Sequence, residues 1–376
     1  MTERPQPAGA GGGAAAALLP RGVLVVGTGL IGTSAALGLR AQGVTVWLQD
    51  ADEESAAVAE ERGAGVRGAP ETAPDLVLVA VPPVAAPTVI LDSLRTYVDA
   101  TVSDVASTKA RLQREVEARA AESSSTALLM RFVAGHPLAG REVSGPAAAL
   151  PDLFADRVWA LTPSEATEPA RTELVRAVVE SLGALPVVTT AEEHDRAVAL
   201  TSHTPQVVSS TVAAGLGGLG ESAVRLSGQG LRDVTRLAAS DPGLWTEILT
   251  SNAEPVADAL DALIERLSAV RDGLREGAAG PVRGALEAGV AGRRLVQGKH
   301  GSGPVEFAVV AVTVADRPGE LGRLFADAGR TGVNLEDVRI EHAQGRPTGL
   351  VELEVAPASQ AALAEGLRSS GWDVRG

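Results

Sequence analysis

The feature that most constrains the fold is a glycine pattern placed directly after a short apolar run. Residues 23–40 read VLVVGTGLIGTSAALGLR, in which Gly27, Gly29 and Gly32 form G-x-G-x-x-G between an expected strand and an expected helix. In this pattern the first glycine permits a tight turn, the second lets the backbone approach a pyrophosphate, and the third lets the helix pack closely on the strand. The helix N-terminus would then face the anion. The pattern predicts a Rossmann-type dinucleotide-binding domain.

The chain from residue 21 to 189 continues the alternation that such a domain requires. Short apolar runs alternate with helical stretches, the first of which are expected at 30–42, 51–62 and 84–94. Alternation of this kind is typical of a doubly wound parallel sheet with helices on both faces. We expect strands at residues 23–27, 44–50, 76–82, 101–104, 131–135 and 158–163.

The cofactor expected on this sheet is NAD. The second strand ends at Asp50, where a carboxylate would accept hydrogen bonds from the adenine-side ribose and would repel the 2′-phosphate of NADP. The alternative role for Asp50 is to cap the helix that follows. The residues expected to contact the cofactor are Gly27, Thr28, Gly29, Leu30, Ile31, Gly32, Asp50, Val81 and Pro82.

Two further folded parts are expected after the sheet. Residues 190–298 lack strand signals and carry Ala-, Leu- and Val-rich helices expected at 191–216 and 256–274, a pattern typical of an all-α dimerisation domain that buries its apolar stripes. Residues 299–304 form a Gly/Ser/Pro linker. Residues 305–376 read βαββαβ, which predicts a small α+β unit with a four-stranded antiparallel sheet and two helices on one face.

Composition narrows the classes of function. A formal net charge of −14 disfavours nucleic acid as a partner, because binding a phosphate backbone requires a basic face. The chain has no cysteine, and its five histidines show no ligand spacing, so no metal site is expected. No apolar run approaches the ~20 residues that cross a bilayer, so no membrane partner is expected. Residues 1–20, rich in Ala, Gly and Pro, are predicted to be a disordered lead-in to a cytoplasmic protein.

Two polar side chains follow central strands of the predicted sheet. Ser107 lies in DVASTK after the fourth strand, and His136 lies in AGHPLAGRE after the fifth. Ligand contacts gather at the carboxyl ends of strands in open α/β sheets. A histidine at such an end suits a general base or a group that polarises a hydroxyl. Ser107 has an alternative role as the N-cap of a helix that begins at Thr108.

Five motifs stand in the order found in one enzyme family: GTGLIG, DVASTK, GHPLAGRE, SHTP and DVTRLAASDPGLW. Over residues 23–295 the chain resembles the prephenate/arogenate dehydrogenases of tyrosine biosynthesis. The resemblance implies an NAD-dependent oxidoreductase that decarboxylates prephenate to 4-hydroxyphenylpyruvate. The alternative within the family is an arogenate dehydrogenase, which makes tyrosine directly. A homodimer is expected for either enzyme.

The resemblance also implies roles for individual residues. His136 and Ser107 would contact the substrate's ring hydroxyl, while Arg236 would bind a substrate carboxylate with His203 nearby. The other substrate-binding residues implied are Gln206, Arg232 and, at the rim, Glu142. Many relatives carry a second histidine where this chain has Gln206. Prephenate is favoured over arogenate because the stretch SHTPQ offers no carboxylate to pair with the ammonium group of arogenate.

The last part resembles an ACT domain, a small amino-acid-sensing unit, through ADRPGELGRLF and GVNLEDVRIEH. This resemblance implies that tyrosine binds as an effector near Asp316, Gly319 and Asn334. The alternative is a purely structural role in dimerisation, because pairing of sheet edges needs no ligand.

Two other functions predict different sets of residues. A hydroxyacid dehydrogenase with a helical second domain would use a lysine on its long helix, and no lysine occurs between Ala110 and Gly298. A non-catalytic regulator that senses NAD and an amino acid predicts a degraded catalytic set. All four expected side chains are nevertheless present: Ser107, His136, His203 and Arg236.

Overall fold

The computed structural model describes residues 19–141, 143–296, 307–342 and 347–375. Most of the expected N-terminal lead-in, the linker 299–304 and Glu142 lie outside the described residues. The chain forms two compact units. The first unit comprises residues 1–226 and 233–262, and the second comprises residues 227–232 and 263–376.

An eight-stranded sheet forms the centre of the first unit, with the strand order β3-β2-β1-β4-β5-β6-β7-β8. Its strands are β1 (Gly22–Val26), β2 (Thr45–Gln49), β3 (Val66–Arg67), β4 (Leu76–Val79), β5 (Thr101–Asp104), β6 (Phe132–Pro137), β7 (Val158–Pro163) and β8 (Leu185–Val188). The six strands from β3 to β6 run parallel, so the expected parallel sheet of a Rossmann-type domain is confirmed for this part.

The far edge of this sheet differs from the prediction. Strand β7 pairs antiparallel with β6 and parallel with β8. A parallel return requires a long crossover, usually an α-helix, whereas the described residues between Leu138 and Arg157 form only the short 3₁₀ helix η2 (Pro146–Ala148). The strand therefore comes back in the opposite direction. The edge strands β3 and β8 were not predicted, because β3 has two residues and β8 carries a proline.

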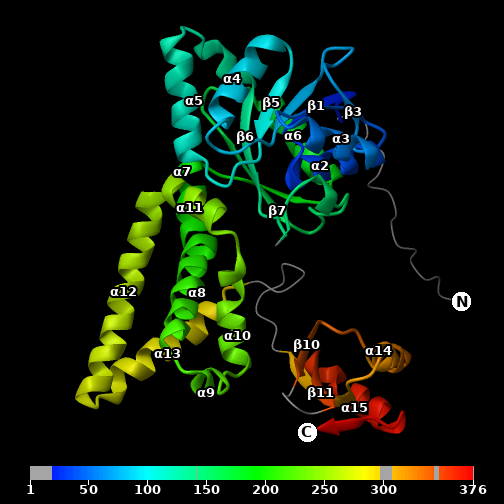
Figure 1. Cartoon of the computed structure of the whole chain (residues 1–376), viewed down its shortest axis with the longest axis vertical. Coiled ribbons are helices and arrows are strands. Elements are labelled where there is room, and N and C mark those ends of the chain that lie inside the picture. Colours follow the sequence, from blue (N-terminus) through cyan, green and yellow to red (C-terminus); the bar gives the residue numbers. More distant parts are fainter. Residues whose placement is uncertain (1–18, 142, 297–306, 343–346, 376) are drawn as a thin grey trace, which may run out of the picture. The chain divides into compact units, whose positions relative to one another are not determined.

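Helices cover both faces of the sheet, as Figure 1 shows. The helices α2 (Leu30–Ala41), α3 (Glu53–Glu61) and α6 (Pro169–Ser181) flank one face. The helices α4 (Ala86–Thr96) and α5 (Ala110–Glu122) pack on the other, with η1 (Thr126–Arg131) after them. Two cores result, built mainly from Val, Leu and Ala side chains, one on each side of the strands. This layering confirms the doubly wound architecture.

After β8 the chain forms a series of helices as far as Arg293. They are α7 (Ala191–Val198), η3 (Ala199–His203), α8 (Thr204–Ala214), η4 (Gly215–Gly218), α9 (Glu221–Val224), α10 (Gln229–Thr235), η5 (Arg236–Ala239), α11 (Pro242–Ser251), α12 (Ala253–Glu276) and α13 (Ala279–Arg293). The helix expected at 191–216 is interrupted, because η3 is a π-helical turn between two α-helical stretches. Such turns are rare and occur frequently at functional sites. The helix expected at 256–274 lies inside α12.

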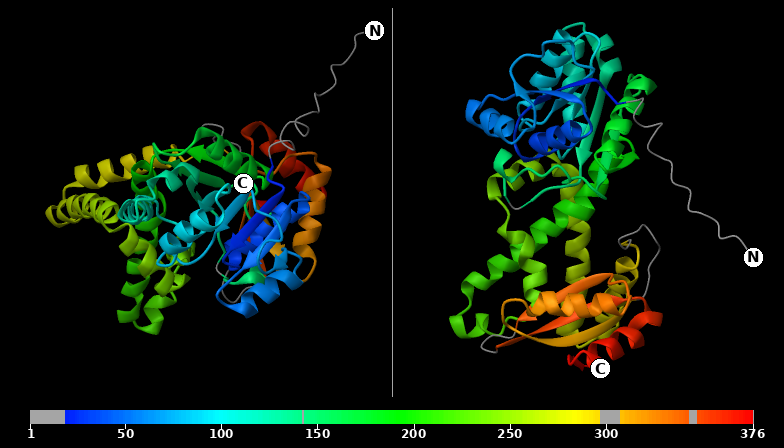
Figure 2. Two further views of the ribbon diagram at one scale, coloured as in Figure 1. Left: turned by 90° about the horizontal axis from the view of Figure 1, so that it is seen from above. Right: turned by 90° about the vertical axis from the view of Figure 1, so that its right-hand side faces the viewer.

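The second unit contains a four-stranded antiparallel sheet in the order β10-β11-β9-β12. Its elements are β9 (Ala308–Ala315), α14 (Glu320–Arg330), β10 (Asp337–His342), β11 (Thr348–Val355), η6 (Pro357–Ser359), α15 (Gln360–Ser369) and β12 (Asp373–Arg375). Alternate residues of β9 and β11 are buried in one core with α14 and α15, so both helices pack on the same face; they can be followed in Figure 2. The predicted βαββαβ order is confirmed.

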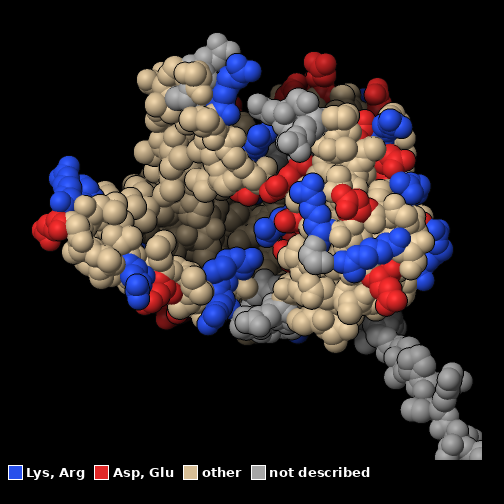
Figure 3. Space-filling view, turned by 90° about the horizontal axis from the view of Figure 1, so that it is seen from below, with Lys and Arg blue, Asp and Glu red and all other residues tan. Residues whose placement is uncertain are grey.

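Two surface properties bear on possible partners. Among the described residues, no helix combines the length and the apolar character needed to cross a bilayer. On the face drawn in Figure 3, arginine and lysine side chains are interspersed with acidic ones. Positive charge is therefore not gathered into one continuous patch on that face.

Candidate active site

The glycine-rich loop between β1 and α2 has the geometry that its sequence predicts. Gly27 has a φ of +100°, and a Cβ there would lie 2.3 Å from the carbonyl oxygen of Ala80. A Cβ on Gly32 would lie 2.0 Å from the carbonyl oxygen of Gly27. Gly29, the N-cap of α2, has open space where its Cβ would point. The loop is thus a cradle in which a pyrophosphate can approach the helix N-terminus, so these residues fit a dinucleotide.

Asp50 connects the end of β2 to this cradle. Its Oδ2 accepts hydrogen bonds from the backbone N–H of Thr28 (2.5 Å) and from the Thr28 hydroxyl (2.8 Å). Asp52, not Asp50, is the N-cap of α3, because the Asp52 side chain accepts from Glu54 N. The capping role considered for Asp50 is therefore wrong. Val81, which follows β4 beside β1, lies at the same edge of the sheet.

A cavity of about 700 Å³ lies at the carboxyl ends of β5 and β6. It brings together Ser107, His136 and His203, three of the residues that the sequence predicts, and we name it the histidine cavity. Its wall includes apolar side chains from α7 and α11, among them Val198 and Leu244. The charged side chains that line it are Arg141 and Asp241. The cavity is therefore a largely apolar pocket with a few convergent polar groups, which is the usual make-up of a small-molecule site.

Of the remaining predicted substrate residues, the three that the structure describes do not line the cavity. Gln206 is buried in α8, where its amide nitrogen donates to the carbonyl oxygen of Leu237 (2.9 Å), and it does not line the cavity. Arg236 begins η5 with an exposed side chain and does not line the cavity either. Arg232 belongs to the second unit, and Glu142 is not described.

His136 is hydrogen-bonded to a second histidine that sequence reasoning missed. His136 Nδ1 lies 2.9 Å from His194 Nε2, and the two rings meet edge to face. His194 Nδ1 in turn lies 2.8 Å from Asp195 Oδ1. Burial lowers the pKa of His136 well below its ordinary value, and the neighbouring His194 and Lys109 lower it further. The ring is therefore neutral at neutral pH and available to accept a proton.

Asp195 also caps α5. Its Oδ1 accepts from the backbone N–H of Lys109 and its Oδ2 from that of Ala110, both at 2.9 Å. Burial raises the pKa of Asp195, but the hydrogen bonds from His194, Lys109 and Ala110 outweigh it, and the net shift is downward. The helix begins at Ala110 and is capped by Asp195, so the capping role considered for Ser107 is wrong.

A buried ion pair lies beneath this arrangement. The Lys109 ammonium pairs with the Asp104 carboxylate and donates to the carbonyl oxygen of Gly135 (2.6 Å), one residue before His136. Burial lowers the pKa of Lys109, and the Asp104 charge opposes that shift. Removing either partner would leave an uncompensated charge in the interior, which is strongly destabilising. The pair fixes the end of β6 from which His136 projects.

His203 has its own buried partner. Its Nδ1 lies 3.1 Å from the side-chain nitrogen of Asn252, which also donates to the backbone carbonyl oxygen of Asp195 (2.8 Å). Burial lowers the pKa of His203 to about 4; Asp195 raises it, and His194 lowers it. The Trp245 ring meets the His203 ring edge to face at a centroid distance of 6.1 Å. Trp245 thus packs against His203, and it also lines the cavity.

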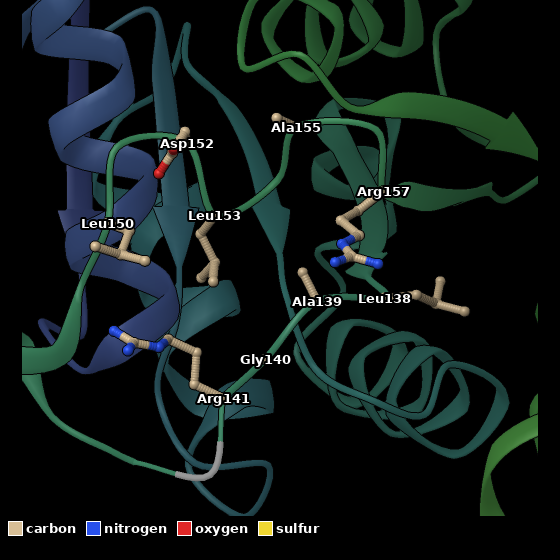
Figure 4. A pocket seen from close by; sticks show the side chains of 9 residues that line it. All are labelled: Leu138, Ala139, Gly140, Arg141, Leu150, Asp152, Leu153, Ala155 and Arg157. Carbon is tan, nitrogen blue, oxygen red and sulfur yellow. The ribbon is translucent and has the colours of Figure 1, made fainter. Parts of the chain in front are cut away.

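A second cavity, of about 480 Å³, shares the segment 138–141 with the histidine cavity. Figure 4 shows Arg141 and Arg157 projecting from opposite ends of the connection between β6 and β7, with Asp152 on the same side as Leu150. Arg141 also donates to the carbonyl oxygen of Ala148 (2.7 Å). The loop after β6 therefore lies between two cavities.

Comparison with known proteins gives consistent matches. Residues 35–188 match the family model of the prephenate dehydrogenase nucleotide-binding domain, and residues 190–286 match that of the prephenate dehydrogenase dimerization domain. The chain is 38% identical over 371 residues to the probable prephenate dehydrogenase NovF of Streptomyces niveus, covering 94% of this chain and 99% of that protein.

Two solved structures are also similar. One is the prephenate dehydrogenase of A. aeolicus in complex with hydroxyphenyl propionate and NAD+, at 28% identity and a TM-score of 0.65, with 73% of this chain and 97% of that chain covered. The other is the arogenate dehydrogenase of Synechocystis, at 26% identity and a TM-score of 0.63, with 72% of this chain and 98% of that chain covered. Since the family models span most of the chain and the relative matches nearly all of it, this chain belongs to the prephenate dehydrogenase family of NAD-dependent oxidoreductases.

Proposed function

We propose that this chain oxidises and decarboxylates prephenate to 4-hydroxyphenylpyruvate, with His136 as the general base. The observation that carries the proposal is the histidine cavity, where Ser107 and His136 lie at the carboxyl edge of a sheet that also bears a dinucleotide cradle. Bound NAD supplies the acceptor for the hydride that leaves the hydroxyl-bearing ring carbon.

His136 moves the proton in this scheme. Its Nδ1 is engaged by His194, so Nε2 is the ring nitrogen available to the ring hydroxyl of the substrate. As the C–H bond breaks, Nε2 accepts the hydroxyl proton and the C–O bond becomes a carbonyl. The bond between the ring and its carboxylate then breaks, carbon dioxide leaves, and the electron pair of that bond makes the ring aromatic. The carbonyl oxygen takes the proton back from His136 Nε2 and becomes a phenol hydroxyl. The driving force is the formation of an aromatic ring, and Ser107 orients the hydroxyl.

The substrate's carboxylates require positive charge. We retain Arg236 as the proposed partner of one carboxylate, because a planar guanidinium binds a carboxylate with two hydrogen bonds. Arg141, whose side chain lines the histidine cavity, is a further candidate. Gln206 supports Arg236 indirectly, since it holds the neighbouring residue Leu237. Roles for Arg232 and Glu142 stay as proposed from the family resemblance.

Arogenate is the second candidate substrate, and one observation favours it. Asp241 lines the histidine cavity and offers a carboxylate that could pair with the ammonium group of arogenate. Its Oδ1, however, accepts from Leu244 N (2.7 Å) as the N-cap of α11. One carboxylate oxygen is therefore already engaged, and prephenate, which has no ammonium group, is preferred.

Several wider proposals accompany this function. The match of residues 190–286 to the dimerization-domain family model supports a homodimer, and the enzyme class supports a cytoplasmic location. The four-stranded unit supports an ACT-like regulatory domain, with tyrosine as the effector near Asp316, Gly319 and Asn334. In that unit Gly319 has a φ of +92°, and Asn334 donates to Glu336 (2.8 Å). These three residues are exposed.

The His136→Asn variant tests the general base. It removes the proton acceptor at Nε2, so kcat should fall by about 10²–10⁴-fold. NAD affinity, measured by fluorescence titration, should stay close to that of the wild type because the cradle is untouched. A variant that keeps more than half of the wild-type kcat would rule out this role.

Cofactor choice is tested with Asp50→Asn. The amide keeps an acceptor for Thr28 but loses the negative charge, so kcat/KM for NADP should rise relative to that for NAD. Asp52→Asn is the matched control, because Asp52 caps α3 and asparagine caps equally well. An unchanged cofactor preference in Asp50→Asn would show that Asp50 serves only to hold the loop.

Substrate choice is tested by measuring kcat/KM for prephenate and for arogenate under one set of conditions. We expect prephenate to be preferred. A preference for arogenate above about tenfold, equivalent to ~1.4 kcal/mol, would overturn that choice. In that case Asp241→Asn should weaken arogenate turnover selectively, since asparagine still caps α11.

The effector proposal is tested with Asn334→Ala in the full-length chain. If tyrosine binds at the small sheet, the tyrosine concentration that halves activity should rise several-fold while uninhibited kcat stays unchanged. Inhibition that saturating prephenate relieves, and that Asn334→Ala does not alter, would instead mean competition at the active site.

A further inference from the structure

Three buried polar side chains behind the histidine cavity are not used by the family motifs that predicted the site. His194, Asp195 and Asn252 are each at most 4% exposed, and none of them lines the cavity. They nevertheless contact both cavity histidines, since His194 bonds to His136 and Asn252 to His203. Asp195 connects these two contacts. Its carboxylate bonds to His194, which we call the carboxylate branch, and its backbone carbonyl oxygen accepts from Asn252, which we call the carbonyl branch.

The carboxylate branch fixes where the protons of His194 and His136 reside. Both carboxylate oxygens of Asp195 already act as acceptors, because Oδ1 accepts a hydrogen bond from the backbone N–H of Lys109 and Oδ2 accepts one from that of Ala110. His194 Nδ1, 2.8 Å from Oδ1, must therefore donate. A neutral imidazole has one donor and one acceptor, so His194 Nε2 accepts from His136 Nδ1. The remaining nitrogen of His136, Nε2, then carries no proton.

The carbonyl branch has the opposite outcome for His203. The side-chain nitrogen of Asn252 lies 2.8 Å from the carbonyl oxygen of Asp195, a contact that only the amide nitrogen can make as a donor. The same nitrogen lies 3.1 Å from His203 Nδ1, so Nδ1 is the acceptor. The proton of neutral His203 must therefore be on Nε2.

We infer that Asp195 organises a network that sets opposite tautomers on the two cavity histidines. His136 presents a bare Nε2, which accepts a proton, and His203 presents an Nε2–H, which donates to an oxygen of the substrate. His194, Asp195 and Asn252 are positioning residues, because each acts through a histidine that lines the cavity. The catalytic consequence rests on the proposed function, whereas the tautomers follow from the hydrogen bonds between neutral imidazole rings.

The two histidines thereby have distinct tasks. A ring hydroxyl is a proton donor and matches His136, whereas a carboxylate or keto oxygen is an acceptor and matches His203. A substrate bound the other way round would place a carboxylate or keto oxygen against the bare nitrogen of His136, and two acceptors would then face each other with no proton between them. The network therefore orients a hydroxylated carboxylic acid in the cavity as well as activating it.

The first test needs no substrate. In the full-length chain labelled with ¹⁵N-histidine, nitrogen chemical shifts distinguish protonated from bare ring nitrogens, and the five histidines can be assigned by single substitutions. We expect His136 to carry its proton on Nδ1 and His203 on Nε2 at neutral pH. The reverse pattern at either residue would overturn the inference, whatever the enzyme turns over.

The second test compares two substitutions at His194. His194→Leu removes the acceptor for His136, and kcat should fall by roughly 10²–10⁴-fold while KM for the substrate and for NAD changes by only a few-fold. His194→Gln offers an amide oxygen to His136 and an amide nitrogen to Asp195, and should recover most of the lost kcat. A kcat of His194→Leu close to that of the wild type would refute the network. A folded His194→Gln variant with a kcat as low as that of His194→Leu would refute it too.

The two tests separate the inference from the proposed function. If the chain turns over neither prephenate nor arogenate, the proposed function fails, while the nitrogen shifts still decide the tautomers. If His194→Leu does not fold, the glutamine variant and its ¹⁵N spectrum decide instead: His136 with a protonated Nδ1 in that variant supports the network, and a protonated Nε2 contradicts it.

Discussion

The site depends on one interaction, the capping of α5 by the carboxylate of Asp195. A helix N-terminus exposes backbone N–H groups that need acceptors, and here the acceptor comes from α7, 85 and 86 residues further along the chain. The bond ties the first helix after the sheet to the loop that carries Ser107. His194, adjacent in sequence, is thereby held against His136 at the end of β6. The segment that caps α5 is thus also the segment that orients His136, the proposed base.

The π-helical turn between α7 and α8 explains how one network reaches two histidines. His194 and His203 are nine positions apart, and in a regular α-helix about 100° per residue would place them on roughly opposite sides. The wider turn at Ala199–His203 changes that angle. It lets His203 line the cavity and meet Asn252, while His194 stays against His136.

Local signals predicted much of the fold and part of the site. The glycine cradle, the strand ends bearing Ser107 and His136, and the βαββαβ order all follow from short sequence patterns whose geometry is local. The antiparallel direction of β7 does not follow from such a pattern, because it depends on a connection from β6 to β7 that lacks a long helix. The partnership of His194 with His136 spans 58 residues, and that of Asn252 with Asp195 spans 57. A single histidine or asparagine on an expected helix gives no sign of such a contact.

The low pKa of His136 fits the proposed chemistry for a thermodynamic reason. A strong base would be needed if the ring hydroxyl had to lose its proton to solvent, but aromatisation yields a phenol that keeps it. In the proposed reaction His136 therefore holds the proton only between hydride departure and loss of carbon dioxide. A weak, desolvated imidazole gives the proton back readily, because burial penalises its charged form. In the proposed reaction, burial of His136 thus favours the return of the proton, while Asp195, through His194, keeps the accepting nitrogen facing the substrate.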